Sequence, residues 1–93
     1  MEHLTIKEVS DRLQELKGWE MNDFSSIEKT FEFKTFKEAM EFANNIANEA
    51  ERINHHPDIL ISFNKVKLTL TTHESNGLTH EDFKMAKVIE EWS

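Results

Sequence analysis

The chain has 93 residues, a formal net charge of −7 and no cysteine. This length supports one domain with a modest core, and the lack of cysteine excludes disulfides, thiolate metal sites and cysteine nucleophiles. The acidic charge argues against direct nucleic-acid binding, which normally needs a basic surface. No signal peptide and no run of about 20 apolar residues is visible. We therefore expect a cytoplasmic protein that does not enter a membrane.

The first third of the chain predicts a helix and then two strands. Thr5 and Glu8 have the spacing of a capping box at a helix start, and Gly18 is placed to end that helix. The inward face of this helix is expected to carry Ile6, Val9, Leu13 and Leu16. Residues 19–24 then predict a short strand and residues 27–34 a longer one, with a serine pair between them as the turn.

A long helix is predicted in the middle of the chain. Thr35 and Glu38 form a second capping-box pattern. The helix is expected to end before Pro57, because the residue preceding a proline is disfavoured in the helical conformation. Apolar side chains at three- and four-residue spacing mark the inward face, namely Phe36, Ala39, Met40, Ala43, Ile46, Ala47, Ala50 and Ile53.

The last third predicts a hairpin and a final helix. Apolar residues alternate on either side of a turn at Asn64-Lys65, and Asn64 is expected to take the positive φ of that turn. The alternating residues are Ile59, Ile61, Phe63, Val66, Leu68 and Leu70. A cap at residues 79–82 starts the final helix, whose inward residues are Phe83, Ala86, Ile89 and Trp92. The order α-β-β-α-β-β-α predicts one α+β domain over residues 1–93, with a four-stranded antiparallel sheet and helices packed on one face.

Three of the five histidines lie at boundaries between these elements. His55 and His56 directly follow the long helix, and His73 follows the last strand. Glu51 lies one helical turn before His55, where a carboxylate would stabilise an imidazolium ion. Because the unperturbed pKa of histidine is about 6.5, its side chain can donate and accept protons near neutral pH. The pattern indicates a pocket suited to acid/base chemistry.

Each of these residues also has a purely structural interpretation. Histidines at a helix end are stabilised by the negative end of the helix dipole, and His73 shares its alternation with the solvent-facing side of the preceding strand. Asp82 occupies a routine capping position after Thr79. Zinc is a further interpretation, since histidine and glutamate are suitable ligands. Adjacent histidines project in different directions, however, and the chain has no His-x-x-x-His pair with an intervening Glu.

Several short motifs in the second half of the chain form one joint pattern. They are Glu51 four residues before His55-His56-Pro57, then Asn64-Lys65-Val66, then Leu70-Thr71-Thr72-His73-Glu74, then Gly77-Leu78-Thr79 with Asp82. Together with Gly18-Trp19 after the first helix, this pattern resembles the pterin-4a-carbinolamine dehydratase family over essentially the whole chain. The resemblance implies a hydro-lyase that dehydrates 4a-hydroxytetrahydropterin to quinonoid dihydropterin in tetrahydrobiopterin recycling, with no metal and no cofactor.

The resemblance also implies roles for individual residues. His55 and His73 would transfer protons, while Glu51 and Asp82 would tune or orient the histidines. The implied substrate-binding set is His55, His56, Pro57, Thr72, His73, Glu74, Ser75 and Trp19. In this set backbone groups of residues 72–75 would bind the amide edge of the pterin. Trp19 would form an apolar wall for the ring, with burial in the core as the alternative.

Partners follow from the same resemblance. The family forms dimers that pair into tetramers through the long helix, so we expect a homodimer or homotetramer that binds a pterin substrate. Animal members also act as dimerisation cofactors of a transcription factor, which makes a protein-interaction module the alternative function. A stabilising role toward a pterin-utilising hydroxylase is a third. The titratable side chains favour the enzyme, because a scaffold has no physical need for them.

Overall fold

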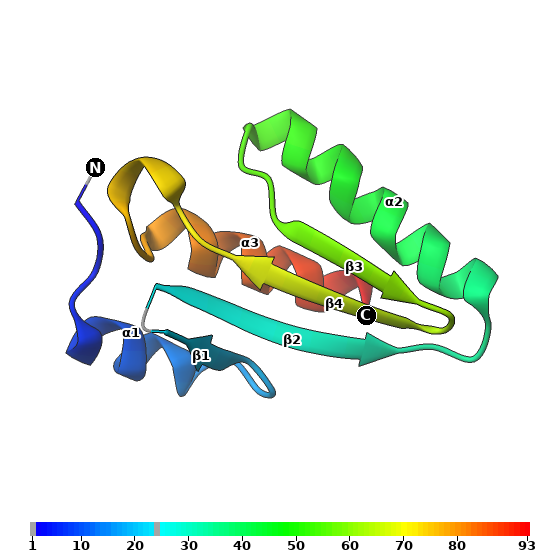
Figure 1. The fold of residues 1–93 in the computed structure, drawn as a ribbon, viewed down its shortest axis with the longest axis horizontal. Helices are drawn as coiled ribbons and strands as arrows, with labels where there is room; N and C mark the ends of the chain where they lie inside the picture. The colour runs from blue at the N-terminus through cyan, green and yellow to red at the C-terminus, as the bar shows by residue number, and fades with distance from the viewer. Residues whose placement is uncertain (1, 24) are drawn as a thin grey trace.

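In the part of the chain that the structure describes, three α-helices pack against one face of a four-stranded antiparallel sheet, as the sequence predicts (Figure 1). The computed structural model describes residues 2–23 and 25–93. The elements are α1 (Ile6–Leu13), β1 (Glu20–Asn22), β2 (Ser26–Glu32), α2 (Phe36–Ile53), β3 (Asp58–Ser62), β4 (Lys65–Leu70), a short 3-10 turn (His73–Ser75) and α3 (His80–Trp92). The strand order is β1-β2-β4-β3, so β1 and β3 form the two edges.

The core lies between the sheet and the helices, and the other face of the sheet is open. Strand alternation buries Ile27, Phe31, Val66, Leu68 and Leu70. The helices add Val9, Ala39, Phe42, Ile46, Ala50, Phe83, Met85, Ala86 and Ile89. Asp58 of β3 and Thr69 of β4 are register partners on the open face. No helix within the described residues is long and apolar enough to cross a bilayer.

The first helix is shorter than predicted. Both bonds of the capping box between Thr5 and Glu8 are formed, at 2.9 and 3.2 Å. The helix ends at Leu13, however, and not near Gly18. Tighter turns follow it, which still bring Leu16 into the core. Gly18 completes the reversal with a φ of +88°, a conformation that side chains with a Cβ rarely adopt.

Several residues expected on inward helix faces are exposed. The exposed fraction is 62% for Ile6, 51% for Phe36 and 38% for Trp92. Each of the three is the first or last residue of its helix, where packing partners lie on one side only. Ala47 is exposed as well, because the buried stripe of α2 runs through Phe42, which the sequence pattern did not assign to the core.

The first hairpin also differs from the prediction at its boundaries. Ser26 was expected in the turn, but it is the first residue of β2 and pairs with Asn22 of β1. Its hydroxyl donates to the carbonyl of Asn22 at 3.1 Å, which holds the two strands together at this end. The predicted strand 19–24 is shorter in the structure, and Phe24 lies outside the described residues.

The second hairpin turns one residue earlier than predicted. Ser62 pairs with Lys65, so the two-residue turn is Phe63-Asn64. The positive φ falls on Phe63, at 54°, and not on Asn64. Asn64 instead donates its side-chain amide to the carbonyl of Phe33 at 2.7 Å, which ties the turn to the end of β2. Phe63 is 71% exposed and so gains little burial in return for a conformation that is unfavourable for a bulky residue.

Replacing Phe63 by asparagine is expected to stabilise the fold. Asparagine tolerates positive φ, so Phe63→Asn should raise the free energy of unfolding by roughly 0.5–1 kcal/mol, part of the cost of a left-handed residue. Urea titration should show a higher midpoint and an unchanged slope. Phe63→Ala removes the exposed ring without favouring positive φ, so it should give no gain. An equal gain in both variants would contradict the backbone explanation.

The capping box of α1 predicts a small dependence of stability on pH. Hydrogen bonds from the backbone amide and then the side chain of Thr5 lower the pKa of Glu8 from its ordinary 4.5. Its contribution to stability is therefore present above pH 4.5 and lost as pH falls through the lower pKa of the folded state. Glu8→Gln keeps the cap but does not titrate, so the higher melting temperature of the wild type at pH 7 should shrink as the pH falls below 4.5. A pH-independent difference would contradict this.

Candidate functional site

The end of α2 directs two adjacent histidines to different surroundings. Asn54 adopts the left-handed conformation, and the amides of Asn54 and His55 both donate to the carbonyl of Ala50. This closes the helix before the chain reaches Pro57. The His55 side chain is 12% exposed, whereas the His56 side chain is 53% exposed. The two neighbours are therefore not equivalent.

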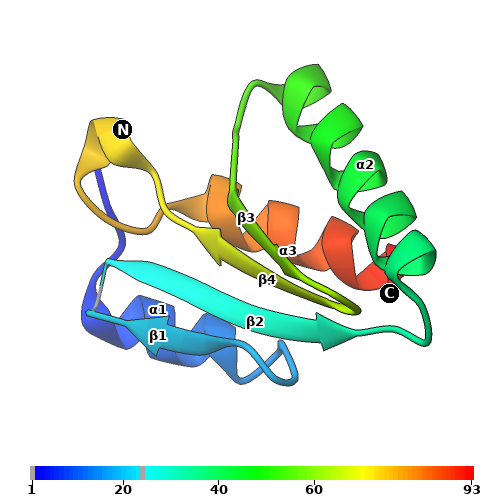
Figure 2. The same ribbon diagram turned by 45° about the vertical axis from the view of Figure 1, so that its right-hand side comes forward.

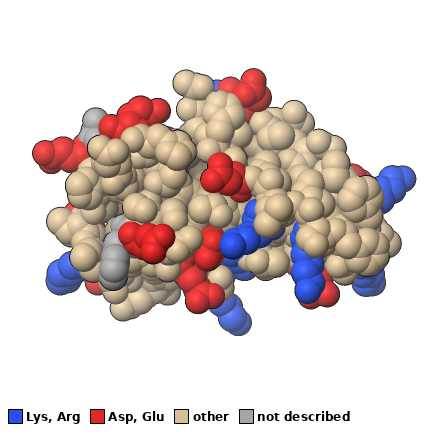
Figure 3. Space-filling view, in the orientation of Figure 1, with Lys and Arg blue, Asp and Glu red and all other residues tan. Residues whose placement is uncertain are grey.

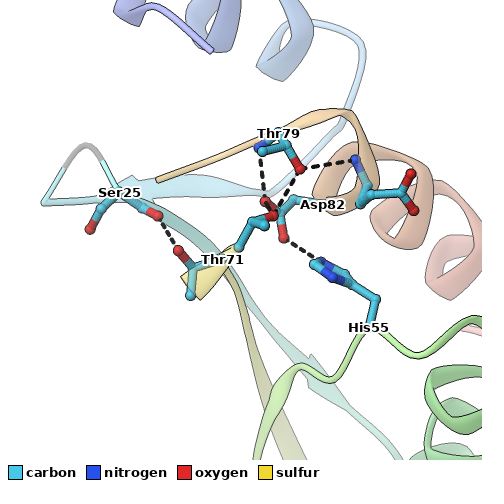
Figure 4. Close-up of polar contacts among 7 residues, drawn as sticks. Ser25, His55, Thr71, Thr79 and Asp82 are labelled. Carbon is cyan, nitrogen blue, oxygen red and sulfur yellow. Dashed lines mark hydrogen bonds and ion pairs between the residues drawn. The ribbon is translucent and has the colours of Figure 1, made fainter. Parts of the chain in front are cut away.

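A buried carboxylate joins three segments of the chain beside His55 (Figure 4). Oδ1 of Asp82 lies 2.7 Å from Nε2 of His55. Oδ2 of Asp82 accepts hydrogen bonds from the hydroxyl of Thr72 at 2.8 Å and from the amide of Thr79 at 3.0 Å. The Asp82 side chain has no solvent exposure. Asp82 thus caps α3 and also contacts a candidate catalytic residue. The interpretation of Asp82 as a helix cap and its interpretation as a group that orients a histidine are therefore compatible.

These hydrogen bonds fix which nitrogen of His55 is available. A carboxylate only accepts hydrogen bonds, so His55 must present Nε2–H to Asp82. Nδ1 is then the nitrogen that can exchange a proton with another molecule. The hydroxyl of Thr72 also lies 2.8 Å from that of Thr79, which in turn accepts from the amide of Glu81 at 3.3 Å. The network therefore holds the carboxylate in one orientation.

Glu51 contacts His56, and the expected proximity to His55 is not observed. Oε2 of Glu51 lies 2.6 Å from Nε2 of His56, and both side chains are more than half exposed. Because Asn54 leaves the helical conformation, residues 51 and 55 no longer share a helix face. An exposed pair of this kind contributes little to stability. It can still fix the orientation of the His56 ring.

The histidines line one cavity at the end of the sheet. Its volume is about 150 Å³, and its lining residues are Asn54, His55, His56, Thr71, His73 and Glu74. His73 reaches it from the 3-10 turn after β4, so the two predicted proton-transfer residues come from different elements. Pro57, Thr72 and Ser75 are not among its lining residues. A second cavity, between α2 and α3, has a volume of about 280 Å³ and no histidine in its lining.

The structure adds two residues to the site that the sequence did not single out. Asn54 lines the cavity because it is the left-handed residue that ends α2, a role that its type and position before the histidine pair could have indicated. Thr71 lines it from the end of β4 and donates its hydroxyl to the carbonyl of Ser25 at 2.5 Å (Figure 4). No local signal marks that contact, because it joins residues 46 positions apart.

Trp19 lies in the core and not in the lining of the histidine cavity. It is 5% exposed, and its ring contacts Phe31 edge-on at a centroid distance of 6.1 Å. These contacts favour core burial, the alternative that the sequence left open. Nε1 of Trp19 has no hydrogen-bond partner among the described residues.

The loop between β4 and α3 is held from both sides. Thr72 and Gly77 pair with each other as an antiparallel bridge. The amide of Leu4 donates to the carbonyl of Leu78 at 2.6 Å, and Figure 2 shows the N-terminal segment beside this loop. A Cβ at position 77 would lie 3.0 Å from Cβ of His3, so any larger residue there would crowd the N-terminal segment. These contacts keep His73 in place opposite the end of α2.

The geometry offers no cluster of metal ligands within residues 2–23 and 25–93. No group of three or more histidine, aspartate or glutamate side chains there is arranged to hold a metal ion. His55 is turned toward Asp82 and His56 toward Glu51, so their ring nitrogens face different partners. The zinc interpretation thus gains no support from the arrangement of these side chains.

The fold and the cavity together define a small α+β domain with a site of histidines and carboxylates. A family model described as "Pterin 4 alpha carbinolamine dehydratase" matches residues 2–92, and the chain belongs to this family. A "Putative pterin-4-alpha-carbinolamine dehydratase" of Sulfurisphaera tokodaii is 46% identical over 98% of this chain and 97% of that protein. A protein of the same name from Koribacter versatilis is 48% identical over 95% and 93%.

Two solved structures share the fold. The crystal structure of a transcriptional coactivator/pterin dehydratase from Brucella melitensis has a TM-score of 0.93 and 37% identity, covering 97% of each chain. A pterin dehydratase-like protein described as a RuBisCO assembly factor in the alpha-carboxysome has a TM-score of 0.70 and 19% identity, covering 81% of this chain and 88% of that one. At that identity the second likeness shows the fold alone.

The hydroxyl of Thr72 is expected to be needed for the stability of this network. Thr72→Val keeps the shape of the side chain but removes a donor to Asp82, so the free energy of unfolding should fall by roughly 1–3 kcal/mol. Thr72→Ser retains the hydroxyl and should lose much less. Urea unfolding of the two variants measures the difference. Equal losses would show that the methyl group, and not the hydrogen bond, is what matters.

Proposed function

We propose that this chain dehydrates a 4a-hydroxytetrahydropterin to the quinonoid dihydropterin. The observation that carries the proposal is the shared cavity of His55 and His73, in which Asp82 holds His55 through one ring nitrogen. Membership of the pterin-4a-carbinolamine dehydratase family supports the same reaction. The two relatives named above both carry the description "Putative pterin-4-alpha-carbinolamine dehydratase".

The reaction balances without a redox partner. The C4a–O bond breaks, the N5–H bond breaks, a C4a–N5 double bond forms, and water leaves. The hydroxyl leaves as water only if it receives a proton, and N5 must lose one. A general acid and a general base are therefore sufficient, and each contributes typically 10²–10⁴-fold.

His55 and His73 form the proton-transfer pair in this proposal. Asp82 holds Nε2–H of His55 and so makes Nδ1 the exchanging atom, while His73 acts from the opposite side of the cavity. The buried position of Asp82 keeps the His55 ring in one orientation throughout turnover.

The remaining lining residues bind the substrate. His56, oriented by Glu51, contacts the pterin ring at the open side of the cavity. The amide and the carbonyl of Thr72 already pair with Gly77. Two further backbone groups are also paired, because the amide of Ser75 donates to the carbonyl of Thr72 and the carbonyl of His73 accepts from the amide of Asn76. We therefore assign the binding of the pterin's amide edge to the other backbone groups of residues 73–75. Glu74 lines the cavity beside them.

A second candidate function is protein binding. The Brucella protein is described as a transcriptional coactivator as well as a pterin dehydratase. Exposed apolar side chains suitable for a partner or for a second subunit are Phe36, Leu60 and Phe63, at 51%, 62% and 71% exposure. A homodimer or homotetramer would cover part of this surface. A stoichiometric protein partner together with no pterin turnover would favour this function over the enzyme.

Substitution of either catalytic histidine is expected to lower turnover strongly. His55→Ala and His73→Ala should each reduce kcat by roughly 10²-fold or more in a stopped-flow assay of 4a-hydroxytetrahydropterin dehydration. His56→Ala should chiefly raise KM, because it removes binding shared by the ground and transition states. His80→Ala, an exposed histidine outside the cavity, is the matched control and should change neither constant.

Two results would contradict the assignment. Equal kinetic effects at His55 and His56 would show that the two roles are not divided as proposed. Activity that is lost on treatment with phenanthroline and restored by zinc would overturn the metal-free mechanism.

A further inference from the structure

Another cavity lies at the end of the sheet opposite to the histidines. Its volume is about 370 Å³. Its lining residues come from three parts of the fold, namely Phe33 just after β2, then Glu38, Glu41, Phe42 and Asn45 of α2, and Trp92 of α3. The histidines follow the ends of α2 and β4, whereas this cavity borders the first half of α2 and the end of β2. The proposed dehydration therefore does not use it.

We propose that this cavity binds a small organic cation that carries a methylated ammonium group, such as choline. The inference is independent of the proposed dehydration, because the two cavities share no lining residue. We call the cavity at this end of the sheet the aromatic cavity.

Three aromatic side chains form the apolar part of the lining. The ring centroids of Phe33 and Phe42 are 4.9 Å apart, and the two rings are tilted by 45°. Phe42 is buried and Phe33 is half-buried, whereas Trp92 is 38% exposed. Trp92 is thus the ring most accessible to a ligand. The face of an aromatic ring attracts a cation, and tryptophan does so most strongly.

Carboxylates border these rings. Glu41 is exposed and has no hydrogen bond or ion pair with any described residue. Glu38 accepts a hydrogen bond at Oε1 from the amide of Lys34 at 3.1 Å, which leaves Oε2 without a partner among the described residues. The side-chain amide of Asn45 has no partner among them either. The cavity therefore offers acceptors and negative charge beside its aromatic rings.

Basic side chains do not neutralise this charge. The described lining residues include no lysine or arginine. Lys37 precedes Glu41 by one helical turn, but the two form no ion pair in the described part of the chain. Nζ of Lys29 lies 4.7 Å from the ring centroid of Phe31, yet it is paired with Glu90 at 2.6 Å. On the face in Figure 3 the basic side chains do not gather into one broad patch. A bound cation would thus give Glu41 the counter-ion that it lacks.

The ends of two helices border the cavity with opposite partial charges. The start of α2 is positive, and Glu38 in its first turn compensates that charge. The end of α3 is negative, and its last turn, residues 89–92, contains no lysine or arginine. The partial charge at the end of α3 therefore lacks the usual compensation, which also favours a cation beside Trp92.

A methylated ammonium group fits this lining better than a metal ion or a bare ammonium ion. No group of three or more acidic or histidine side chains within the described residues is arranged to hold a metal. Aromatic rings cannot replace the water around a strongly hydrated ion, whereas N-methyl groups gain free energy when they are buried against apolar surface. The volume of about 370 Å³ lies within the roughly 300–1,000 Å³ that is typical of ligand sites.

The test is a titration of the full chain, followed through the indole N–H signals in NMR spectra. The chain has two tryptophans, so Trp92 reports on the aromatic cavity and the buried Trp19 serves as an internal control. The ligands are choline, its uncharged isostere 3,3-dimethyl-1-butanol, and ammonium. The variants are Glu41→Gln and Trp92→Leu, and in the latter the side-chain amide signal of Asn45 is the reporter. Glu20→Gln removes the same charge from an exposed residue outside the cavity and is the matched control.

Choline should shift the Trp92 signal saturably, with a Kd of roughly 1–10 mM, and should leave the Trp19 signal unchanged. The uncharged isostere should bind about ten-fold more weakly, because it lacks the attraction to the rings and carboxylates. Glu41→Gln should weaken choline binding roughly three- to ten-fold, and Trp92→Leu about ten-fold. Glu20→Gln should not change the affinity.

Four results would overturn the proposal. They are the absence of a saturable shift of the Trp92 signal in the millimolar range, equal affinities for choline and its isostere, ammonium binding as tight as that of choline, and equal weakening by Glu41→Gln and Glu20→Gln. The last would show attraction by the net charge of the protein and not a site. None of these results affects the dehydratase proposal, because Glu41 and Trp92 lie outside the histidine cavity. Turnover of the pterin should accordingly be the same in Glu41→Gln as in the wild type.

Discussion

The buried carboxylate of Asp82 is the group on which both the loop after β4 and the histidine cavity depend. Its hydrogen-bond donors come from the end of α2, the end of β4 and the start of α3, namely His55, Thr72 and Thr79. A buried carboxylate is costly unless its oxygens are paired, and a low local dielectric strengthens the bonds it does make. The three segments are therefore held together by the requirement to satisfy one side chain. The position of His55 follows from the same requirement.

Local patterns in the sequence were sufficient for the elements but not for all of their ends. Alternation in strands and three- and four-residue spacing in helices arise because the side chains that face the core are apolar. Most of the core residues follow one of these two patterns. The end of α1 at Leu13 and the turn at Phe63 depend on backbone conformations that tertiary contacts decide. At the turn, asparagine is the residue type that tolerates positive φ best, but the side chain of Asn64 instead donates a hydrogen bond to the carbonyl of Phe33. Such a contact between distant residues has no signature in the local sequence.

The site shows the same division between local and distant effects. The positions of His55, His56 and His73 at element boundaries predicted that they share a cavity, because chain ends at one edge of a sheet come together. The expected pairing of Glu51 with His55 was wrong, since it assumed that helical spacing continues past Asn54. A role of Asp82 in tuning or orienting the histidines was expected only through the family resemblance, and the structure shows that the histidine it contacts is His55. Spacing alone indicates a helix cap at Asp82, and a cap is also what the structure contains.

The cap and the site reinforce each other electrostatically. Asp82 lies in the first turn of α3, where the partial positive charge of the helix N-terminus favours a carboxylate. His55 follows the last turn of α2, where the partial negative charge of the C-terminus favours a cation. The ends of the two helices thus match Asp82 and His55 in sign and bring them to 2.7 Å. His56 lies beside the same helix end but pairs with an exposed carboxylate that solvent screens. The difference between the two histidines therefore arises from how the helices end and not from the residue type, which is why adjacent identical residues can have separate functions.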